Sequence, residues 1–270
     1  FEPAFDSYIP NIVSCGAIPV ILQLEYPSYK INWDKLKSAI TPKTKAIIIN
    51  SPHNPTGSVM SDDEMLQLQE ILRDTKIFLI SDEVYEHLTY DGLEHNSVLK
   101  YPELFERSFA CFSFGKVYNC TGWKLGYCIA PKAWTTEFRK IHQYNAFCCF
   151  TPTQVAIAEH LKTPSTYLGL KHFMQQKRDL FISLMENTGF DFLPVDGGYF
   201  VTATYEKISS LGGLDLAMQL TKTAGVATIP YSTFYNKGQD HKILRFCFAK
   251  KDETLRAAAE KLKSIAPNSF

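Results

Sequence analysis

Short runs that are apolar on both alternating faces recur through the first half of the chain, and they restrict the possible folds more than any other feature. The runs are Lys45–Asn50 (KAIIIN), Ile77–Ser81 (IFLIS), Phe109–Phe114 and Leu125–Ala130. Strands without a polar face, separated by helical stretches, are typical of a parallel sheet that helices cover on both sides. The sequence therefore predicts an α/β fold with a mostly parallel sheet.

One of the intervening stretches carries a clear helix signature. Ser61 is placed to cap the helix, and Glu64 occupies the matching position of a capping box. Met65, Leu68 and Leu72 then recur on one helical face. We therefore expect a helix that begins directly after residue 61.

The pattern changes in the second half of the chain. Residues 133–186 are predicted to be helical, and the tail mixes strands with helices: Tyr199–Ala203, Leu214–Ala224, Ile243–Phe248 and Glu253–Ile265. We expect a large domain over residues 1–180 and a smaller α+β domain over residues 181–270. Because strand-like sequence follows Phe1 at once, we expect the large domain to be incomplete at its N-terminus.

Charge and cysteine content limit the kinds of binding partner and the cellular compartment that we expect. Twenty-eight basic and 28 acidic residues give no net charge, so no overall field attracts nucleic acid or anionic lipid. No apolar stretch is long enough for a membrane span. Seven cysteines, an odd number, predict free thiols and a reducing, cytoplasmic compartment, and their spacing predicts no metal site.

The residues that follow each predicted strand are the candidates for chemistry, because ligands of parallel sheets bind beyond the carboxyl ends of the strands. They are Asn54 in N-S-P-H-N-P-T-G, Asp82 and Tyr85 in S-D-E-V-Y, and Ser113 and Lys116 in S-F-G-K. Each motif also has a plain interpretation: a rigid turn for Asn54, a helix cap for Asp82, a surface amine for Lys116. Taken singly, the motifs leave both interpretations open.

Arg245 stands out because it lies in an apolar strand, L-R-F-C-F at 244–248. A guanidinium group in such a strand is costly unless it meets an anion. The anion can be an internal Asp or Glu, or the carboxylate of a substrate held by two parallel hydrogen bonds.

Together with T-G-W-K-L-G at 121–126, these motifs resemble the class I (fold-type I) aminotransferases in residue type, order and spacing. Further stretches resemble the group of kynurenine aminotransferases, glutamine transaminases and methionine aminotransferases: E-P-A-F-D-S-Y at 2–8, H-Q-Y-N-A-F at 142–147, D-G-G-Y-F at 196–200 and I-P-Y-S-T-F-Y at 229–235. The resemblance implies fold type I, a large domain that binds pyridoxal 5'-phosphate (PLP), and no metal.

The resemblance also implies a role for each candidate residue in the chemistry of PLP. Lys116 matches the family's Schiff-base lysine, which also moves the proton at the substrate α-carbon. Asp82 matches the carboxylate that faces the pyridine nitrogen and keeps it protonated. Tyr85 and Asn54 match donors to the phenolic oxygen of the cofactor.

The remaining candidates match anchoring groups. Ser113 and Lys124 correspond to phosphate ligands, and Phe5 to the aromatic ring that stacks on the cofactor. Arg245, with Asn54, corresponds to the group that binds the substrate α-carboxylate. Tyr8 and Tyr231 are possible pocket neighbours, or packing residues.

The implied reaction moves an amino group from an amino acid of methionine, glutamine or aromatic type to a 2-oxo acid, in a homodimer. Kynurenine enzymes place a histidine where Cys148 stands, so a methionine-like or aromatic substrate is favoured. The family also has a segment before the equivalent of Phe1, and we expect the parent protein to be longer.

Two alternatives use the same motifs. Carbon–sulfur β-lyases share the fold and need the same Lys116 and Asp82, so the sequence separates them poorly from transaminases. A non-enzymatic regulator with an aminotransferase-like domain could lose the lysine, which this chain retains.

Overall fold

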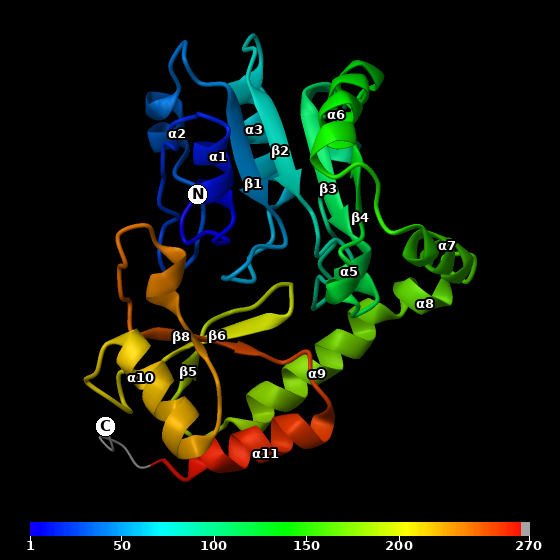
Figure 1. Ribbon diagram of the computed structural model, residues 1–270. Helices are drawn as coiled ribbons and strands as arrows, with labels where there is room; N and C mark the ends of the chain where they lie inside the picture. The colour runs from blue at the N-terminus through cyan, green and yellow to red at the C-terminus, as the bar shows by residue number, and fades with distance from the viewer. Residues whose placement is uncertain (266–270) are drawn as a thin grey trace. The chain divides into compact units, whose positions relative to one another are not determined.

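The computed structural model describes residues 1–265 of the chain, and these residues form two compact units (Figure 1). The first unit contains Phe1–Ala39, Asn54–Ser58 and the residues from Phe173 onward. The second contains Ile40–His53 and Val59–His172. The domain boundary at residue 180 stays a prediction. The compact units group residues 1–39 with the C-terminal part, a division that no single boundary along the chain can express.

The second unit is built on a four-stranded sheet with the order β1-β2-β3-β4. Its strands are β1 (Ala46–Asn50), β2 (Phe78–Asp82), β3 (Ser108–Ser113) and β4 (Gly126–Ile129). The first three are parallel neighbours, with Asn50 beside Asp82 and Asp82 beside Cys111. All four predicted strands are present, and the prediction of a mostly parallel α/β sheet is confirmed.

The fourth strand, β4, departs from the parallel pattern, because it pairs with β3 in the antiparallel sense. The connection from β3 to β4 contains only the short helix α5 (Phe114–Val117) and a 3-10 turn (Thr121–Trp123). A parallel return needs a crossover long enough to travel back along the sheet. The short connection instead reverses the chain at the carboxyl end of β3.

Helices pack on the strands of the second unit. In α3 (Asp62–Leu72), Ser61 and Glu64 form the predicted capping box, and Met65, Leu68 and Leu72 are buried. From α6 (Lys132–Asn145), Trp134 packs edge-on against Phe78 of β2, with ring centroids 4.6 Å apart. The remaining helices of this unit are short: α4 (Pro102–Phe105), α7 (Thr151–His160) and α8 (Ser165–Leu168).

The first unit contains an antiparallel sheet with the order β5-β6-β8-β7. Its strands are β5 (Asp191–Phe192), β6 (Phe200–Thr204), β7 (Ile229–Pro230) and β8 (Ile243–Cys247). The helices of this unit are α1 (Tyr8–Ser14), α2 (Trp33–Ala39), most of α9 (Leu170–Leu184), α10 (Gly213–Gln219) and α11 (Asp252–Lys263). One sheet face is buried around Phe246, whose ring contacts Phe181, Phe190 and Phe192.

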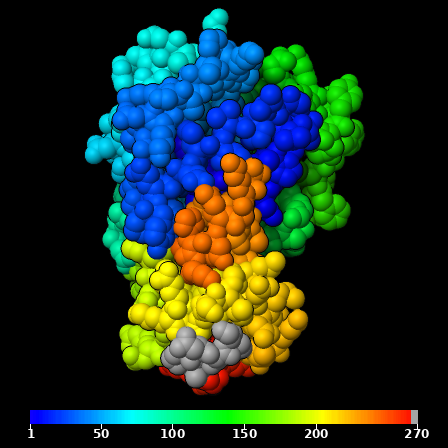
Figure 2. Space-filling view, turned by 90° about the vertical axis from the view of Figure 1, so that its left-hand side faces the viewer, coloured from blue at the N-terminus to red at the C-terminus, as the bar shows by residue number. Residues whose placement is uncertain are grey.

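The first residues of the chain lie against the segment around residues 231–241 of the same unit, blue against orange in Figure 2. Ala4 donates a backbone hydrogen bond to the carbonyl of Phe234 (2.8 Å). The ring of Tyr26 stacks on His241 at 5.5 Å. These contacts attach Phe5 and Tyr8 to the unit that carries Arg245.

Among the described residues, no helix has the length and apolar character that a bilayer crossing requires.

Candidate active site

Three polar residues lie at one edge of the second unit's sheet, and two of them are predicted site residues. Asn50, Asp82 and Ser113 are the last residues of β1, β2 and β3. Because these strands are parallel, their carboxyl ends meet at the same edge, where α/β sheets bind ligands. The structure therefore brings Asp82 and Ser113 to the edge that the sequence predicts.

Asp82 is held by its neighbours at this edge. The backbone N–H of Val84 donates to its Oδ1 (3.3 Å), and the Asn50 side chain donates to its backbone carbonyl (2.9 Å). The carboxylate is half-buried. A half-buried carboxylate in a fixed position can face a cationic ring nitrogen and favour its protonated form.

Glu83, the neighbour of Asp82, has a structural role that the sequence does not reveal. Its side chain is 1% exposed, and it accepts hydrogen bonds from the hydroxyl of Ser81 (2.8 Å), the N–H of Val98 (3.1 Å) and the ring Nε2 of His95 (2.7 Å). A buried carboxylate with three donors fixes the loop that follows β2. The adjacent acids Asp82 and Glu83 are the only sequence signal, and they do not reveal the distant donors.

Lys116 and Tyr85 lie together in the second unit. The Lys116 ammonium is 5.5 Å from the centroid of the Tyr85 ring, which is 3% exposed. Lys116 belongs to α5, one residue after the buried Gly115. A Cβ on Gly115 would lie 3.0 Å from the Cα of Thr121, so glycine lets the two backbones approach closely. The predicted amine and phenol are thus neighbours.

The two predicted phosphate ligands flank the same loop. Ser113 precedes α5, and its side chain makes no capping hydrogen bond to that helix. Lys124 ends the 3-10 turn with a left-handed backbone, φ 52°. A hydroxyl and an ammonium on one loop suit a phosphate group.

In the first unit, the side chains of Arg245 and Asn54 contact each other directly. The Arg245 guanidinium donates to the Asn54 side-chain oxygen over 2.6 Å. It also lies over two aromatic rings, with its central carbon 3.8 Å from the centroid of Phe200 and 4.6 Å from that of Phe234. Both phenylalanines lie in stretches that resemble the family, but the sequence does not reveal their contact with Arg245.

The other predicted aromatics of the first unit differ in exposure. Phe5 is 41% exposed and packs edge-on against Tyr8, with ring centroids 5.7 Å apart. Tyr231 is fully buried against Tyr29, Phe234 and Tyr235. Burial raises the pKa of Tyr231 well above its usual value. The packing interpretation of Tyr231 therefore fits its surroundings, whereas Phe5 presents an accessible ring face.

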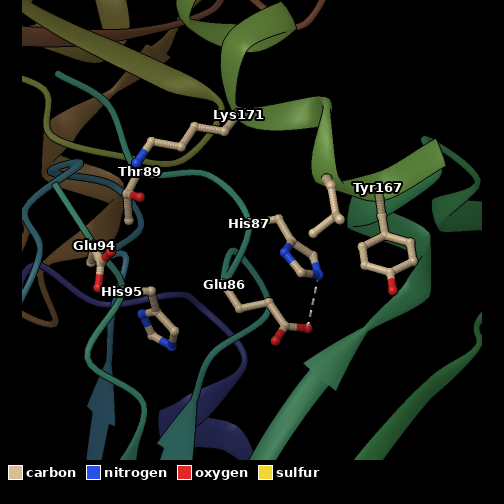
Figure 3. Close-up of a pocket in the computed structure, with 8 residues that line it drawn as sticks. Glu86, His87, Thr89, Glu94, His95, Tyr167 and Lys171 are labelled. Atoms are coloured by element: carbon tan, nitrogen blue, oxygen red, sulfur yellow. Dashed lines mark ion pairs between the residues drawn. The ribbon is translucent and has the colours of Figure 1, made fainter. Parts of the chain in front are cut away.

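A separate cavity of about 260 Å³ lies in the second unit. It is lined by Glu86, His87, Thr89, Glu94, His95, Tyr167, Leu168 and Lys171 (Figure 3). Its polar groups largely contact protein atoms: Glu86 accepts from the hydroxyl of Tyr127 (2.7 Å), and Lys171 donates to the carbonyl of Leu93 (2.5 Å). None of the predicted site residues lines it.

Comparison with known proteins decides the family. Residues 1–262 match the family model described as aminotransferase class I and II. This chain belongs to the family of class I and II aminotransferases. The match extends over both compact units, and it confirms that the chain is an enzyme of the amino-acid aminotransferase type.

The sequences of related aminotransferases align with nearly all of this chain. Methionine aminotransferase from Escherichia coli is 41% identical, over 98% of this chain and 69% of the relative. Kynurenine–oxoglutarate transaminase from Dictyostelium discoideum is 36% identical, over 98% of this chain and 70% of the relative. The chain spans 64% of the length of the human kynurenine–oxoglutarate transaminase 3, at 34% identity.

Solved aminotransferase structures confirm fold type I. The crystal structure of the Escherichia coli methionine aminotransferase matches 97% of this chain and 70% of its own, with a TM-score of 0.94 and 41% identity. N-succinyldiaminopimelate aminotransferase from Mycobacterium tuberculosis matches with a TM-score of 0.92 and 33% identity, over 98% of this chain and 70% of its own.

Proposed function

We propose that this aminotransferase holds PLP on Lys116 and transfers an amino group from a methionine-type amino acid to a 2-oxo acid. The observation that carries the proposal is the position of Lys116 beside the buried Tyr85, in the loop that follows the strand edge formed by Asp82 and Ser113. An amine, a phenol, a carboxylate and a hydroxyl are the groups that PLP chemistry requires.

The residues of the second unit fit the cofactor group by group. Lys116 would hold the cofactor through the amine of its side chain. Asp82 would hold the pyridine nitrogen of the cofactor, and Tyr85 would hold its phenolic oxygen. Ser113 and Lys124 bind the phosphate, the first through its hydroxyl and the second through its charge. When bound, PLP supplies an electron sink for the electrons left at the substrate α-carbon.

Lys116 would also have a second task in the reaction. Its Nζ would hold and move the α-proton of the substrate, which would make it the general base and acid. The ring centroid of Tyr85 is 5.5 Å from the Nζ of Lys116, so the ring restricts where that amine can lie. The carboxylate of Asp82 would favour the protonated form of the ring nitrogen.

The first unit supplies residues for the cofactor ring and the substrate. Phe5, which is 41% exposed, would pack against the cofactor ring. Arg245 binds the α-carboxylate of the amino acid and of the 2-oxo acid, and Asn54 supports it through the 2.6 Å hydrogen bond. A substrate that carries a carboxylate in both half-reactions needs such a permanent cation.

Methionine is the first amino donor to test, because the chain is 41% identical to methionine aminotransferase. We also propose a homodimer, since aromatic side chains of the second unit are strongly exposed: Tyr144, Phe147 and Phe150 are 86%, 79% and 68% exposed. The seven free cysteines support a reducing, cytoplasmic compartment.

The test is an assay of the full-length protein loaded with PLP and supplied with methionine and a 2-oxo acid. Beyond the first turnover, we expect the 2-oxo acid of methionine to form only when an acceptor 2-oxo acid is present. Lys116→Ala should lower the rate by about 10³-fold or more, because it removes the group that moves the α-proton. Lys140→Ala is the matched control, since this lysine of α6 is 64% exposed and pairs with Glu137.

The assay separates the alternatives. Release of pyruvate and ammonia from a cysteine conjugate without any acceptor would identify a β-lyase instead. No turnover of amino acids by the wild-type protein, with no visible absorbance from bound cofactor, would overturn the proposal.

A further inference from the structure

The position of Arg245 in its sheet selects its neighbours. Arg245 pairs with Thr202 of β6, and Phe200 lies two residues from Thr202 on the same strand. Side chains two residues apart project from the same face of a strand, and a diagonal neighbour is within reach of an aromatic ring. Arg245 and Phe200 therefore share the sheet face opposite the buried Leu244 and Phe246.

Phe234 reaches the same guanidinium from another element. It ends the 3-10 turn Tyr231–Phe234, it is 8% exposed, and its carbonyl accepts the hydrogen bond from the N–H of Ala4 (2.8 Å). Its ring packs edge-on against the fully buried Tyr231, with centroids 5.9 Å apart. A ring held on both its backbone and its face cannot follow the arginine, so the arginine conforms to the ring.

We propose that Phe200 and Phe234 form an aromatic clamp that positions Arg245 to bind the substrate carboxylate. This inference rests on the proposed function, because it takes Arg245 as the carboxylate-binding group. The distances of 3.8 and 4.6 Å from the guanidinium carbon to the two ring centroids are within the range of cation–π contact.

The chemistry of these partners suits a binding site for an anion. The two rings and the Asn54 amide oxygen orient the guanidinium, and all three are uncharged. A carboxylate in their place would orient the arginine equally well but would compete with the substrate for the same charge. Orientation before binding also reduces the side-chain entropy that is lost when the substrate arrives.

The clamp acts on binding rather than on the chemical step. The carboxylate is bound in the same way before and during removal of the α-proton, so loss of the clamp weakens ground state and transition state together. Such a loss raises KM and leaves kcat nearly unchanged.

The test uses Phe200→Leu and Phe234→Leu in the full-length protein loaded with PLP. We expect each variant to raise KM for methionine and for the 2-oxo acid by roughly tenfold, with kcat within about twofold, since a cation–π contact at a shielded site is worth about that factor. Phe192→Leu is the matched control. Phe192 lies in β5 of the same sheet and packs against Phe246 on its other face, so its KM should stay at the wild-type value.

Direct binding separates positioning from general damage. The dissociation constant of 4-(methylthio)butanoate, which is methionine without its amino group, should rise about tenfold in both clamp variants by titration calorimetry. The affinity for 3-(methylthio)propylamine, which lacks the carboxylate, should not change. Phe200→Tyr keeps a ring over the guanidinium and should bind the acid like the wild type.

Two results would overturn the clamp: unchanged affinity for the acid in both leucine variants, or equal losses for acid and amine. Neither result touches the proposed function while the wild-type protein still transaminates methionine. A wild-type protein that binds the acid but never transaminates would overturn the proposed function, and the calorimetric comparison of the variants would still decide the clamp.

Discussion

At the scale of single residues, surroundings assign different tasks to chemically identical groups. Asp82 ends β2 at the sheet edge, half-buried, with one backbone N–H on its Oδ1. Glu83 follows immediately, but its carboxylate is enclosed and accepts three hydrogen bonds. We therefore propose a chemical role for Asp82, whereas Glu83 supports the loop that follows β2.

The role of Glu83 predicts a stability effect. Glu83→Gln keeps the shape of the side chain but removes its charge and one acceptor oxygen. Ser81 and Val98 share Oε1 and His95 contacts Oε2, so one of these two sides loses its acceptor. We expect the free energy of unfolding to fall by about 1 to 3 kcal/mol in urea titrations. Glu94→Gln is the control, because that side chain is 86% exposed, and it should change the free energy by less than about 0.5 kcal/mol. Equal effects of the two changes would contradict the supporting role.

His53 predicts a pH dependence. The residue is 7% exposed, and burial lowers its pKa to about 3. The unfolded chain takes up a proton on this imidazole near pH 6.5, whereas the folded protein does not until about pH 3. The contribution of neutral His53 is therefore complete above pH 6.5 and is lost progressively as the pH falls toward 3.

The check is the pH slope of stability, measured by urea unfolding between pH 7 and pH 4. His53→Asn cannot take up the proton, so its free energy of unfolding should fall less steeply with acid, by up to about 1.4 kcal/mol per pH unit. Identical slopes for the variant and the wild type would show that His53 is not buried as a neutral group.

Contacts between residues that are far apart in the chain could not be predicted from the sequence. Lys116, Asp82 and Tyr85 follow strands that the sequence identifies, so their place at the sheet edge could be predicted. The contact between Arg245 and Asn54 spans 191 residues, and the rings of Phe200 and Phe234 reach Arg245 from two further segments. Only tertiary packing reveals such contacts.

At the scale of elements, continuous apolar runs predicted β1 to β4, and every residue of β2 and β3 is buried or half-buried. The strand β4 is less covered, because Gly126 and Ile129 are exposed. The direction of β4 could not be read from its residues, since direction depends on the length of the connection before it. The strands β5 and β7 contain two residues each, too few to show a period. The capping box of α3 was predicted because all its signals lie within four residues.

Gly126 predicts how tightly β3 and β4 are packed. It pairs with Ser113, and a Cβ at this position would clash with the carbonyl oxygen of Phe112. Gly126→Ala must shift the backbone of β4, so we expect a loss of about 1 to 3 kcal/mol in the free energy of unfolding. Gly122→Ala is the control, because its Cβ would meet no atom within 4 Å. A tolerated alanine at Gly126 would contradict the close pairing of these strands.

At the scale of the whole molecule, the chain consists of two compact units, each with its own sheet and its own share of the predicted residues. Lys116, Asp82, Tyr85, Ser113 and Lys124 belong to the second unit, and Phe5, Asn54 and Arg245 to the first. The family match extends from residue 1 to residue 262. Amino transfer is therefore expected of the intact protein, and only the intact protein should be assayed.

The most direct test of the account locates the cofactor on the chain. The full-length protein is incubated with PLP, reduced with borohydride to make the link permanent, digested and analysed by mass spectrometry. We predict one modified lysine, Lys116, and no modification after the protein has first been treated with methionine, which displaces the amine. Cofactor attached to Lys124 or to another lysine, or the same labelling with and without methionine, would contradict the assignment of Lys116.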